Sequence, residues 1–183
     1  MKKLTVRDMA YIAMMAVVIS VCSWITVPAG DIPFTLQTFG VFCAVSLLGG
    51  RRGLISVCVY LALGLVGVPV FAGFTAGAGK LLGVTGGYLV GFVFLALGYW
   101  LVTAVCGEKI GARIAGMVLG LILCYAFGTV WFVVLYTKKV AAIGFAAALM
   151  KCVVPFILPD AVKLALAMLL TSRLRKPLGL CAA

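Results

Sequence analysis

Long apolar runs, separated by short polar or basic connections, make up most of the chain. A membrane-spanning helix needs about 20 predominantly apolar residues, and six runs approach or reach that character. They extend approximately over Met9–Gly30, Phe34–Gly50, Leu54–Gly67, Tyr88–Cys106, Ile114–Tyr136 and Val153–Thr171. The pattern therefore predicts an all-α integral membrane protein with six transmembrane helices, organised as a single transmembrane domain over residues 1–183.

Three connections between these runs have a distinctive composition. The stretch Val68–Tyr88 is apolar but rich in glycine, and each interior glycine costs a helix about 0.8–1 kcal/mol relative to alanine. Irregular backbone at membrane depth is tolerated where protein covers it or where it lines a cavity. We therefore expect an irregular stretch here. Val27–Pro33 is expected to be a turn, and Val140–Met150 a short amphipathic or partly buried segment.

The basic residues are distributed unevenly between the two sides of the predicted bundle. With both termini on the cytoplasmic side, that side carries Lys2, Lys3, Arg7, Arg51, Arg52, Lys109, Arg113, Arg173, Arg175 and Lys176, and the outer side carries Lys80, Lys138, Lys139 and Lys151. Cytoplasmic connections are enriched in lysine and arginine, so this distribution predicts cytoplasmic termini. The irregular connections then face outward, and we expect a binding site on the outer face.

The composition supports a membrane protein and disfavours other classes. Hydrophobic residues make up 66% of the chain and charged residues 10%, whereas soluble domains have about 25% charged residues. The net charge is +11, but the basic residues lie at the ends of apolar runs and form no aromatic-rich patch. We therefore expect a lipid bilayer around the chain and no nucleic-acid partner.

Residues suited to enzymatic chemistry are few. The chain has no histidine, and its acids are Asp8, Asp31, Glu108 and Asp160. Its seven cysteines are scattered without a CxxC spacing, so neither a metal site nor a disulfide framework is expected. The sequence thus favours a protein that is not an enzyme and that holds no metal.

An acid and a base interrupt the last apolar run. Asp160 and Lys163 are three residues apart, so both lie on the same face of a helix and can form an ion pair. A single charge at the centre of a membrane helix costs about 2.5–3.5 kcal/mol on insertion scales, and such residues usually face a cavity or a partner. We expect this pair to form a functional site; the alternative is an ion pair that only stabilises the helix.

Four stretches form an ordered set of motifs along the chain. They are Asp31–Gly40 with PFTLQTF, Gly67–Gly73 with GVPVFAG, Leu82–Phe92 with LGVTGGYLVGF, and Leu158–Lys163 with LPDAVK. This set resembles the motifs of the BioY family, the biotin-specific substrate-capture (S) components of energy-coupling-factor (ECF) transporters. The resemblance covers the chain from the first helix to the last.

The resemblance implies an architecture and a set of partners. The fold would be an ECF S-component-like bundle of six helices in the bacterial cell membrane. Its outward-facing biotin pocket would be lidded by the connections after helices one, three and five. The implied partners are an ECF transmembrane coupling protein and two cytoplasmic ATPase subunits. This chain has no GxxxxGK[ST] loop and is expected to need no cofactor, since ATP is used by the partner ATPases.

Biotin has a ureido ring with two N–H donors and a carbonyl, an apolar thioether ring and an acidic tail. Asp160 can accept a hydrogen bond from a ureido N–H, while Lys163 keeps Asp160 ionised or donates to the ligand. Gln37 and Thr35 can complete this recognition; the alternatives for them are hydrogen bonds between helices and helix capping.

The glycine-rich stretch supplies the remaining candidates for ligand contact. They are Gly73, Thr75, Lys80, Gly86, Gly87 and Tyr88. The glycines allow the backbone to approach a ligand closely, or else a tight bend between helices. Tyr88 can cover the biotin rings or sit in an interfacial aromatic belt. Leu89 stands where some relatives have an arginine, so Lys80 can attract the carboxylate instead; the alternative is a solvated lysine.

Small residues on the first helix provide a candidate surface for partner docking. S components tend to carry an AxxxA motif there, because small side chains allow close contact between helices. In this chain Ala10, Ala13 and Ala16 are spaced by three residues and match that motif only approximately.

Three other functions remain open from the sequence. One is an S component for a different vitamin, such as riboflavin or thiamine. Another is a proton-coupled carrier that uses Asp160 alone. The third, a membrane-embedded enzyme, is disfavoured by the lack of histidine and of paired acids.

Overall fold

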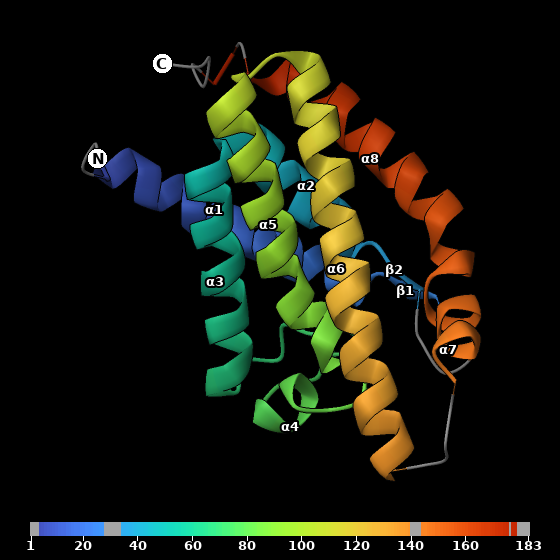
Figure 1. Ribbon diagram of the computed structural model, residues 1–183. Helices are drawn as coiled ribbons and strands as arrows, with labels where there is room; N and C mark the ends of the chain where they lie inside the picture. Colours follow the sequence, from blue (N-terminus) through green and yellow to red (C-terminus); the bar gives the residue numbers. More distant parts are fainter. Residues whose placement is uncertain (1–3, 28–33, 140–143, 176, 179–183) are drawn as a thin grey trace.

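The computed structural model describes residues 4–27, 34–139, 144–175 and 177–178, and most of these residues are helical (Figure 1). The longer helices are α1 (Val6–Trp24), α2 (Gln37–Leu48), α3 (Gly50–Val66), α5 (Gly86–Cys106), α6 (Ile110–Lys139) and α8 (Val154–Leu174). The shorter elements are α4 (Ala78–Leu81), α7 (Phe145–Cys152) and the strands β1 (Thr26–Val27) and β2 (Phe34–Thr35).

Each of the six predicted apolar runs overlaps one of the longer helices. Four of them, α1, α5, α6 and α8, are long and apolar enough to cross a membrane, while α2 is a shorter apolar helix. The 12 residues of α2 span only about 18 Å, less than the hydrocarbon core of a bilayer. Six membrane crossings therefore stay a prediction.

Three details of the secondary structure differ from those predicted from the sequence. Thr26–Val27 and Phe34–Thr35 form a short antiparallel strand pair, so the fold is not purely helical and α2 starts after Phe34. The glycine-rich stretch contains one helical turn, α4, and its last residues, from Gly86, already belong to α5; the remainder is irregular. The helix expected from Ile114 begins at Ile110 and extends to Lys139. The expected turn after Val27 and the start of the Val140–Met150 segment lie outside the described residues.

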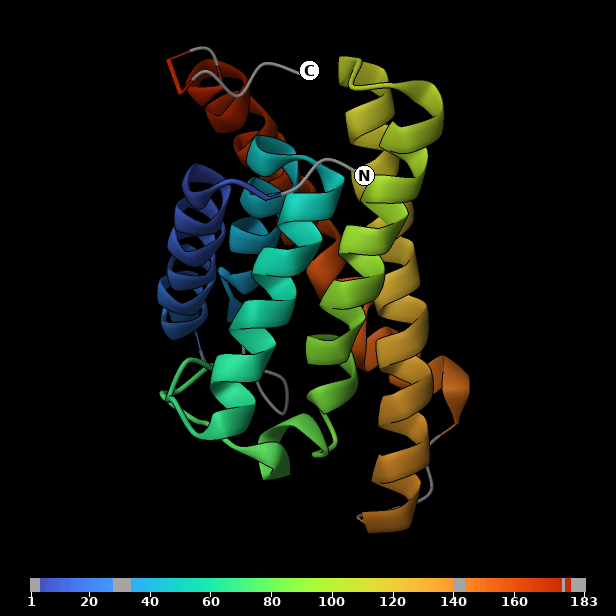
Figure 2. The ribbon, with the colours of Figure 1, turned by 90° about the vertical axis from the view of Figure 1, so that its left-hand side faces the viewer.

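The longer helices alternate in direction between the two ends of the molecule (Figures 1 and 2). The start of α1, the α5–α6 connection and the end of α8 lie at one end, which we call the terminal end. Helices α4 and α7 lie toward the opposite end, which we call the loop end. Helix α2 is central, because it packs against α1, α3 and α8 and its Phe42 is fully buried.

Helices α5 and α6 form a closely packed hairpin because glycines remove side chains from their contact surface. A Cβ atom added at Gly98 would lie 2.9 Å from the Cα atom of Gly120. One added at Gly120 would clash with the carbonyl oxygen of Leu95. Small residues allow such close approach of helices, and this contact fixes one wall of the cavity described below.

Ion pairs and buried hydrogen bonds connect the helices at the terminal end. Arg52 of α3 pairs with Asp8 of α1 at 3.1 Å, and Arg175 pairs with Glu108 at 2.6 Å. Buried Arg113 of α6 donates to the hydroxyl oxygen of Ser46 in α2, and also to Thr171 Oγ1 in α8 at 3.2 Å. These contacts close the bundle at this end, so the cavity lies nearer the loop end.

Candidate binding site

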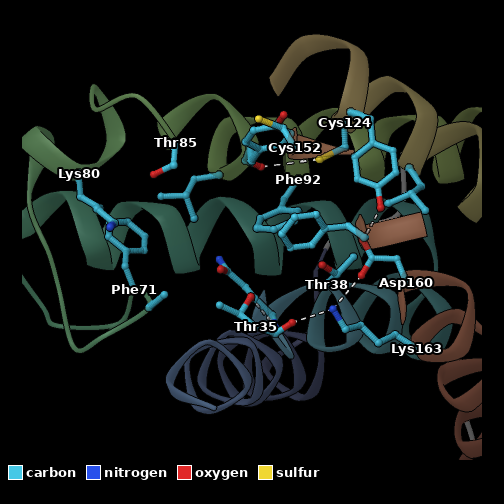
Figure 3. A pocket seen from close by; sticks show the side chains of 17 residues that line it. Thr35, Thr38, Phe71, Lys80, Thr85, Phe92, Cys124, Cys152, Asp160 and Lys163 are labelled. Carbon is cyan, nitrogen blue, oxygen red and sulfur yellow. Dashed lines mark hydrogen bonds and ion pairs between the residues drawn. The ribbon is translucent and has the colours of Figure 1, made fainter. Parts of the chain in front are cut away.

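A cavity with a volume of about 110 Å³ lies between α2, α5, α6 and α8 (Figure 3). By the same measure a single water needs roughly 10–15 Å³, so the cavity has room for a small organic molecule. Its lining consists of Thr35, Gln37, Thr38, Phe71, Ala72, Lys80, Thr85, Tyr88, Leu89, Phe92, Leu121, Cys124, Tyr125, Cys152, Phe156, Asp160 and Lys163. A mainly apolar and aromatic wall with a few polar groups is typical of sites for small molecules.

The predicted ion pair lies in this lining and is buried. Lys163 Nζ is 2.8 Å from Asp160 Oδ1, and the two residues are only 5% and 3% exposed. Tyr125 of α6 donates its hydroxyl to Asp160 Oδ2 at 2.6 Å. Lys163 also donates to the backbone carbonyl oxygen of Thr35 at 2.7 Å. The pair thus joins α8 to α6 and to the connection after α1.

An aromatic ring lies close to the lysine of this pair, and a second ring stacks on the first. Lys163 Nζ lies 4.6 Å from the ring centre of Phe34, a distance at which a cation is attracted to the face of an aromatic ring. Phe34 in turn stacks on Phe156 of α8 with the ring centres 5.1 Å apart. Pro159 lies inside α8 next to Asp160, and its missing N–H removes one helical hydrogen bond there. These contacts hold the lysine head in one place beside the cavity.

Gln37 and Thr35 both line the cavity and also make structural hydrogen bonds. Gln37 Nε2 donates to the hydroxyl oxygen of Tyr60 in α3 at 2.7 Å, and Tyr60 donates to the carbonyl oxygen of Val70 at 3.3 Å. The hydrogen bond between helices, one of the two alternatives for Gln37, is therefore present. The amide oxygen of Gln37 retains its capacity as an acceptor for a ligand.

Tyr88 and Lys80 also line the cavity. The hydroxyl of Tyr88 lies 3.1 Å from Thr129 Oγ1, which links α5 to α6 and leaves the ring against the cavity. Lys80 extends from α4 toward Phe71, at the end of the cavity away from Asp160 and Lys163 (Figure 3).

Four other predicted site residues lie outside the lining: Gly73, Thr75, Gly86 and Gly87. Gly73 has φ +70°, and the Thr75 hydroxyl donates to the Ala72 carbonyl oxygen at 2.9 Å, so both shape a turn. A Cβ atom at Gly86 would clash with the carbonyl oxygen of Leu81, and one at Gly87 with Trp131. These residues position the walls of the cavity through packing.

Several cavity-lining residues were not predicted from the sequence. Tyr125 is the most important of them, because it hydrogen-bonds Asp160. The available signal was a tyrosine in the middle of the apolar run of α6, but its contact with Asp160 depends on the approach of α6 to α8. Phe71, Phe92, Cys124 and Cys152 likewise reach the cavity from separate elements.

The alanines on α1 do not share one surface. Ala10 and Ala13 are exposed, whereas Ala16 is 1% exposed and packs into the core. An exposed docking surface on α1 can therefore include Ala10 and Ala13 but excludes Ala16.

Known sequences that are similar to this chain all indicate one family. The sequence model of the BioY family matches residues 1–179, which include every cavity-lining residue. The biotin transporter BioY of Thermotoga maritima is 38% identical over 172 residues, covering 93% of this chain and 96% of that protein. The probable biotin transporter BioY of Pyrococcus horikoshii is 35% identical over 170 residues, covering 92% of this chain and 96% of that protein.

A solved structure is also similar over most of the fold. It is the crystal structure of the S-component for biotin from an ECF-type ABC transporter, with a TM-score of 0.80 and 28% sequence identity. The match covers 93% of this chain and 92% of that one. The similarity therefore includes the helices that form the cavity.

Proposed function

The chain belongs to the BioY family, and on this premise we propose that it is the biotin-binding S component of an ECF-type transporter. It captures biotin and takes part in its uptake across the membrane. The curated relatives are named as biotin transporters, and the similar solved structure is an S-component for biotin.

One observation carries the proposal: the buried Asp160–Lys163 pair faces a cavity whose other walls are mainly apolar. Two buried charges cost several kcal/mol each to remove from water, and their attraction offsets this cost only with good geometry and additional hydrogen bonds. A ligand with a polar head and an apolar body supplies such hydrogen bonds and fills the rest of the cavity.

The chemistry of the ureido ring matches the groups left available at this pair. Each oxygen of Asp160 accepts one hydrogen bond within the protein, so both keep lone pairs for the two ureido N–H donors. Lys163 uses two of its three donors on Asp160 and Thr35, which leaves one for the ureido carbonyl. Gln37 adds an acceptor nearby, and Phe92, Leu121 and Phe156 pack against the apolar rings.

The three connections expected to form the lid all contribute to the cavity lining. Thr35 comes from the connection after α1, and Phe71, Lys80 and Thr85 come from the connection after α3. Cys152 belongs to α7, in the connection after α6. This placement supports a cavity that opens toward the loop end, which we assign to the outer side of the cell membrane. The six alternating helices and the basic terminal end support six crossings with cytoplasmic termini.

The proposed partners are a transmembrane coupling protein and two cytoplasmic ATPases. No covalent step takes place on this chain, whose part is to bind and deliver the vitamin. The exposed face of α1 around Ala10 and Ala13 is the proposed contact with the coupling protein.

Calorimetry on the purified chain tests the substrate and the site together. Wild type is expected to bind biotin, and Asp160→Asn and Lys163→Met to bind it at least about thirtyfold more weakly, a loss of about 2 kcal/mol or more. Glu108→Gln is the matched control, because it breaks an ion pair with Arg175 at the terminal end, far from the cavity.

Two outcomes would contradict the proposal in different ways. Unchanged affinity in both cavity variants would remove the site assignment and leave the family membership standing. Thermal stabilisation by riboflavin or thiamine, with no effect of biotin, would overturn the substrate.

A further inference from the structure

Lys80 is the third charged residue in the cavity lining, besides Asp160 and Lys163. Its side chain is partly buried and lies at the opposite end of the cavity from that pair (Figure 3). Within the described residues, no carboxylate forms an ion pair with its ammonium group. Among the described residues, the cavity therefore has at this end a cation without an acidic partner.

The turn that carries Lys80 is held in place on both sides. Before α4, the N–H of Gly77 donates to the carbonyl oxygen of Gly64 at 2.7 Å. After α4, the carbonyl oxygen of Gly83 accepts from the Trp131 indole N–H at 3.0 Å. A binding group supported by such contacts loses less conformational freedom when a ligand arrives, which favours binding.

The charges of the lining do not cancel. Asp160 and Lys163 form a neutral pair at 2.8 Å, and Lys80 adds one positive charge. Most of the lining is apolar or aromatic, as at Phe92, which lies between the two ends in Figure 3, so charges in the cavity are screened less than in bulk water. An anionic group at the Lys80 end is favoured, whereas a neutral group gains at most a hydrogen bond from the ammonium group and no ionic attraction.

We propose that Lys80 binds the carboxylate of the acidic tail and makes the cavity selective for the free acid of its ligand. This inference rests on the proposed function, because it takes the ureido ring to lie at Asp160 and Lys163. The five-carbon acid chain then extends past Phe92 to Lys80 (Figure 3). Biotin whose carboxyl group is converted to an amide or an ester loses the ionic part of this contact and binds more weakly.

The test compares biotin with biotinamide, a neutral analogue of almost the same shape, by calorimetry on the full chain. Wild type is expected to bind biotin about 10- to 100-fold more tightly than biotinamide, the range for a hydrogen bond to a charged group. In Lys80→Met this ratio falls to near one, because biotin loses more affinity than biotinamide when the positive charge is removed. Lys80→Arg keeps most of the preference. Lys109→Met, which alters an exposed lysine near the terminal end, is the matched control and leaves the ratio unchanged.

Different results would overturn the role of Lys80 and the proposed function. Equal binding of biotin and biotinamide by wild type would overturn the role of Lys80 while the proposed function stands, and this comparison does not depend on any variant folding. A ratio in Lys80→Met that equals the wild-type ratio would also overturn it. If wild type bound neither compound, the proposed function would fail, and this inference with it.

Discussion

At the level of single residues, the site depends on how the Asp160 carboxylate is held in position inside the protein. Its two oxygens are bound by different helices, one by Lys163 of α8 and the other by Tyr125 of α6. Hydrogen bonds to an ionised group are stronger than those between neutral groups, so both contacts orient the carboxylate as well as stabilise it. The direction in which Asp160 presents its lone pairs to a ligand is therefore set by two neighbours.

Removing the Tyr125 hydroxyl tests this arrangement. Tyr125→Phe keeps the ring but deletes the 2.6 Å hydrogen bond, so biotin affinity is expected to fall about tenfold, as measured by calorimetry. Tyr11→Phe is the control, because its hydroxyl contacts Arg7 on the exposed start of α1. Equal affinity in Tyr125→Phe and wild type would show that Tyr125 does not orient the carboxylate.

The sequence alone predicted the ion pair of the site, but not the contacts that depend on how the helices pack together. Asp160 and Lys163 are three residues apart on one helix, so their contact followed from helical periodicity and was confirmed. Tyr125 meets Asp160 only through the approach of α6 to α8, which no local pattern encodes. Gly86 and Gly87 were predicted as ligand contacts, but their neighbours Leu81 and Trp131 show that they serve packing.

At the scale of elements, the α5–α6 hairpin is the rigid wall against which the other helices form the cavity. It supplies Tyr88, Leu89 and Phe92 from one helix and Leu121 and Tyr125 from the other. Their relative positions depend on the glycine contacts between the two helices. Changes at those glycines should therefore affect both stability and binding.

Two glycines of α6 give a matched pair of variants. Gly120→Ala places a methyl group against the Leu95 carbonyl and is expected to reduce stability by about 1–3 kcal/mol and to weaken biotin binding. Gly111→Ala meets nothing within 4 Å and should leave stability unchanged or slightly raised. Thermal unfolding in detergent measures both. Equal melting temperatures for the two variants would contradict the proposed packing role.

The positions of the helices were predictable from hydrophobicity, but some ends were not. The fifth run was expected to begin at about Ile114, yet α6 begins at Ile110 and includes Arg113. Arg113 is 4% exposed because acceptors on α2 and α8 bind its guanidinium group. A charged residue can therefore lie inside a buried part of a helix where tertiary contacts satisfy its polar groups. Helix α2 starts late because Phe34 and Thr35 pair with the strand after α1.

At the scale of the whole molecule, the two ends of the bundle have different chemistry. The terminal end is held together by ion pairs and buried hydrogen bonds, whereas the loop end carries the irregular connections and borders the cavity. This division fits the proposed roles of a fixed cytoplasmic end and an outer end that receives the ligand. It leaves the exposed face of α1 free for a partner helix.

Large side chains on that face should separate partner binding from ligand binding. Ala10→Trp and Ala13→Trp are expected to prevent assembly with the coupling protein, measured by co-purification, and to leave biotin affinity unchanged. Ala104→Trp, at an exposed position of α5, is the control and should assemble normally. Normal assembly of both α1 variants would place the contact on another surface.

An experimental structure of the chain with biotin bound would show directly whether the Asp160–Lys163 pair recognises the ureido ring. We expect this ring in the cavity, with its nitrogens roughly 2.7–3.2 Å from the Asp160 carboxylate and its carbonyl oxygen toward Lys163. Biotin bound elsewhere, or bound in the reverse direction with its carboxylate on Lys163, would show that the pair does not have this role.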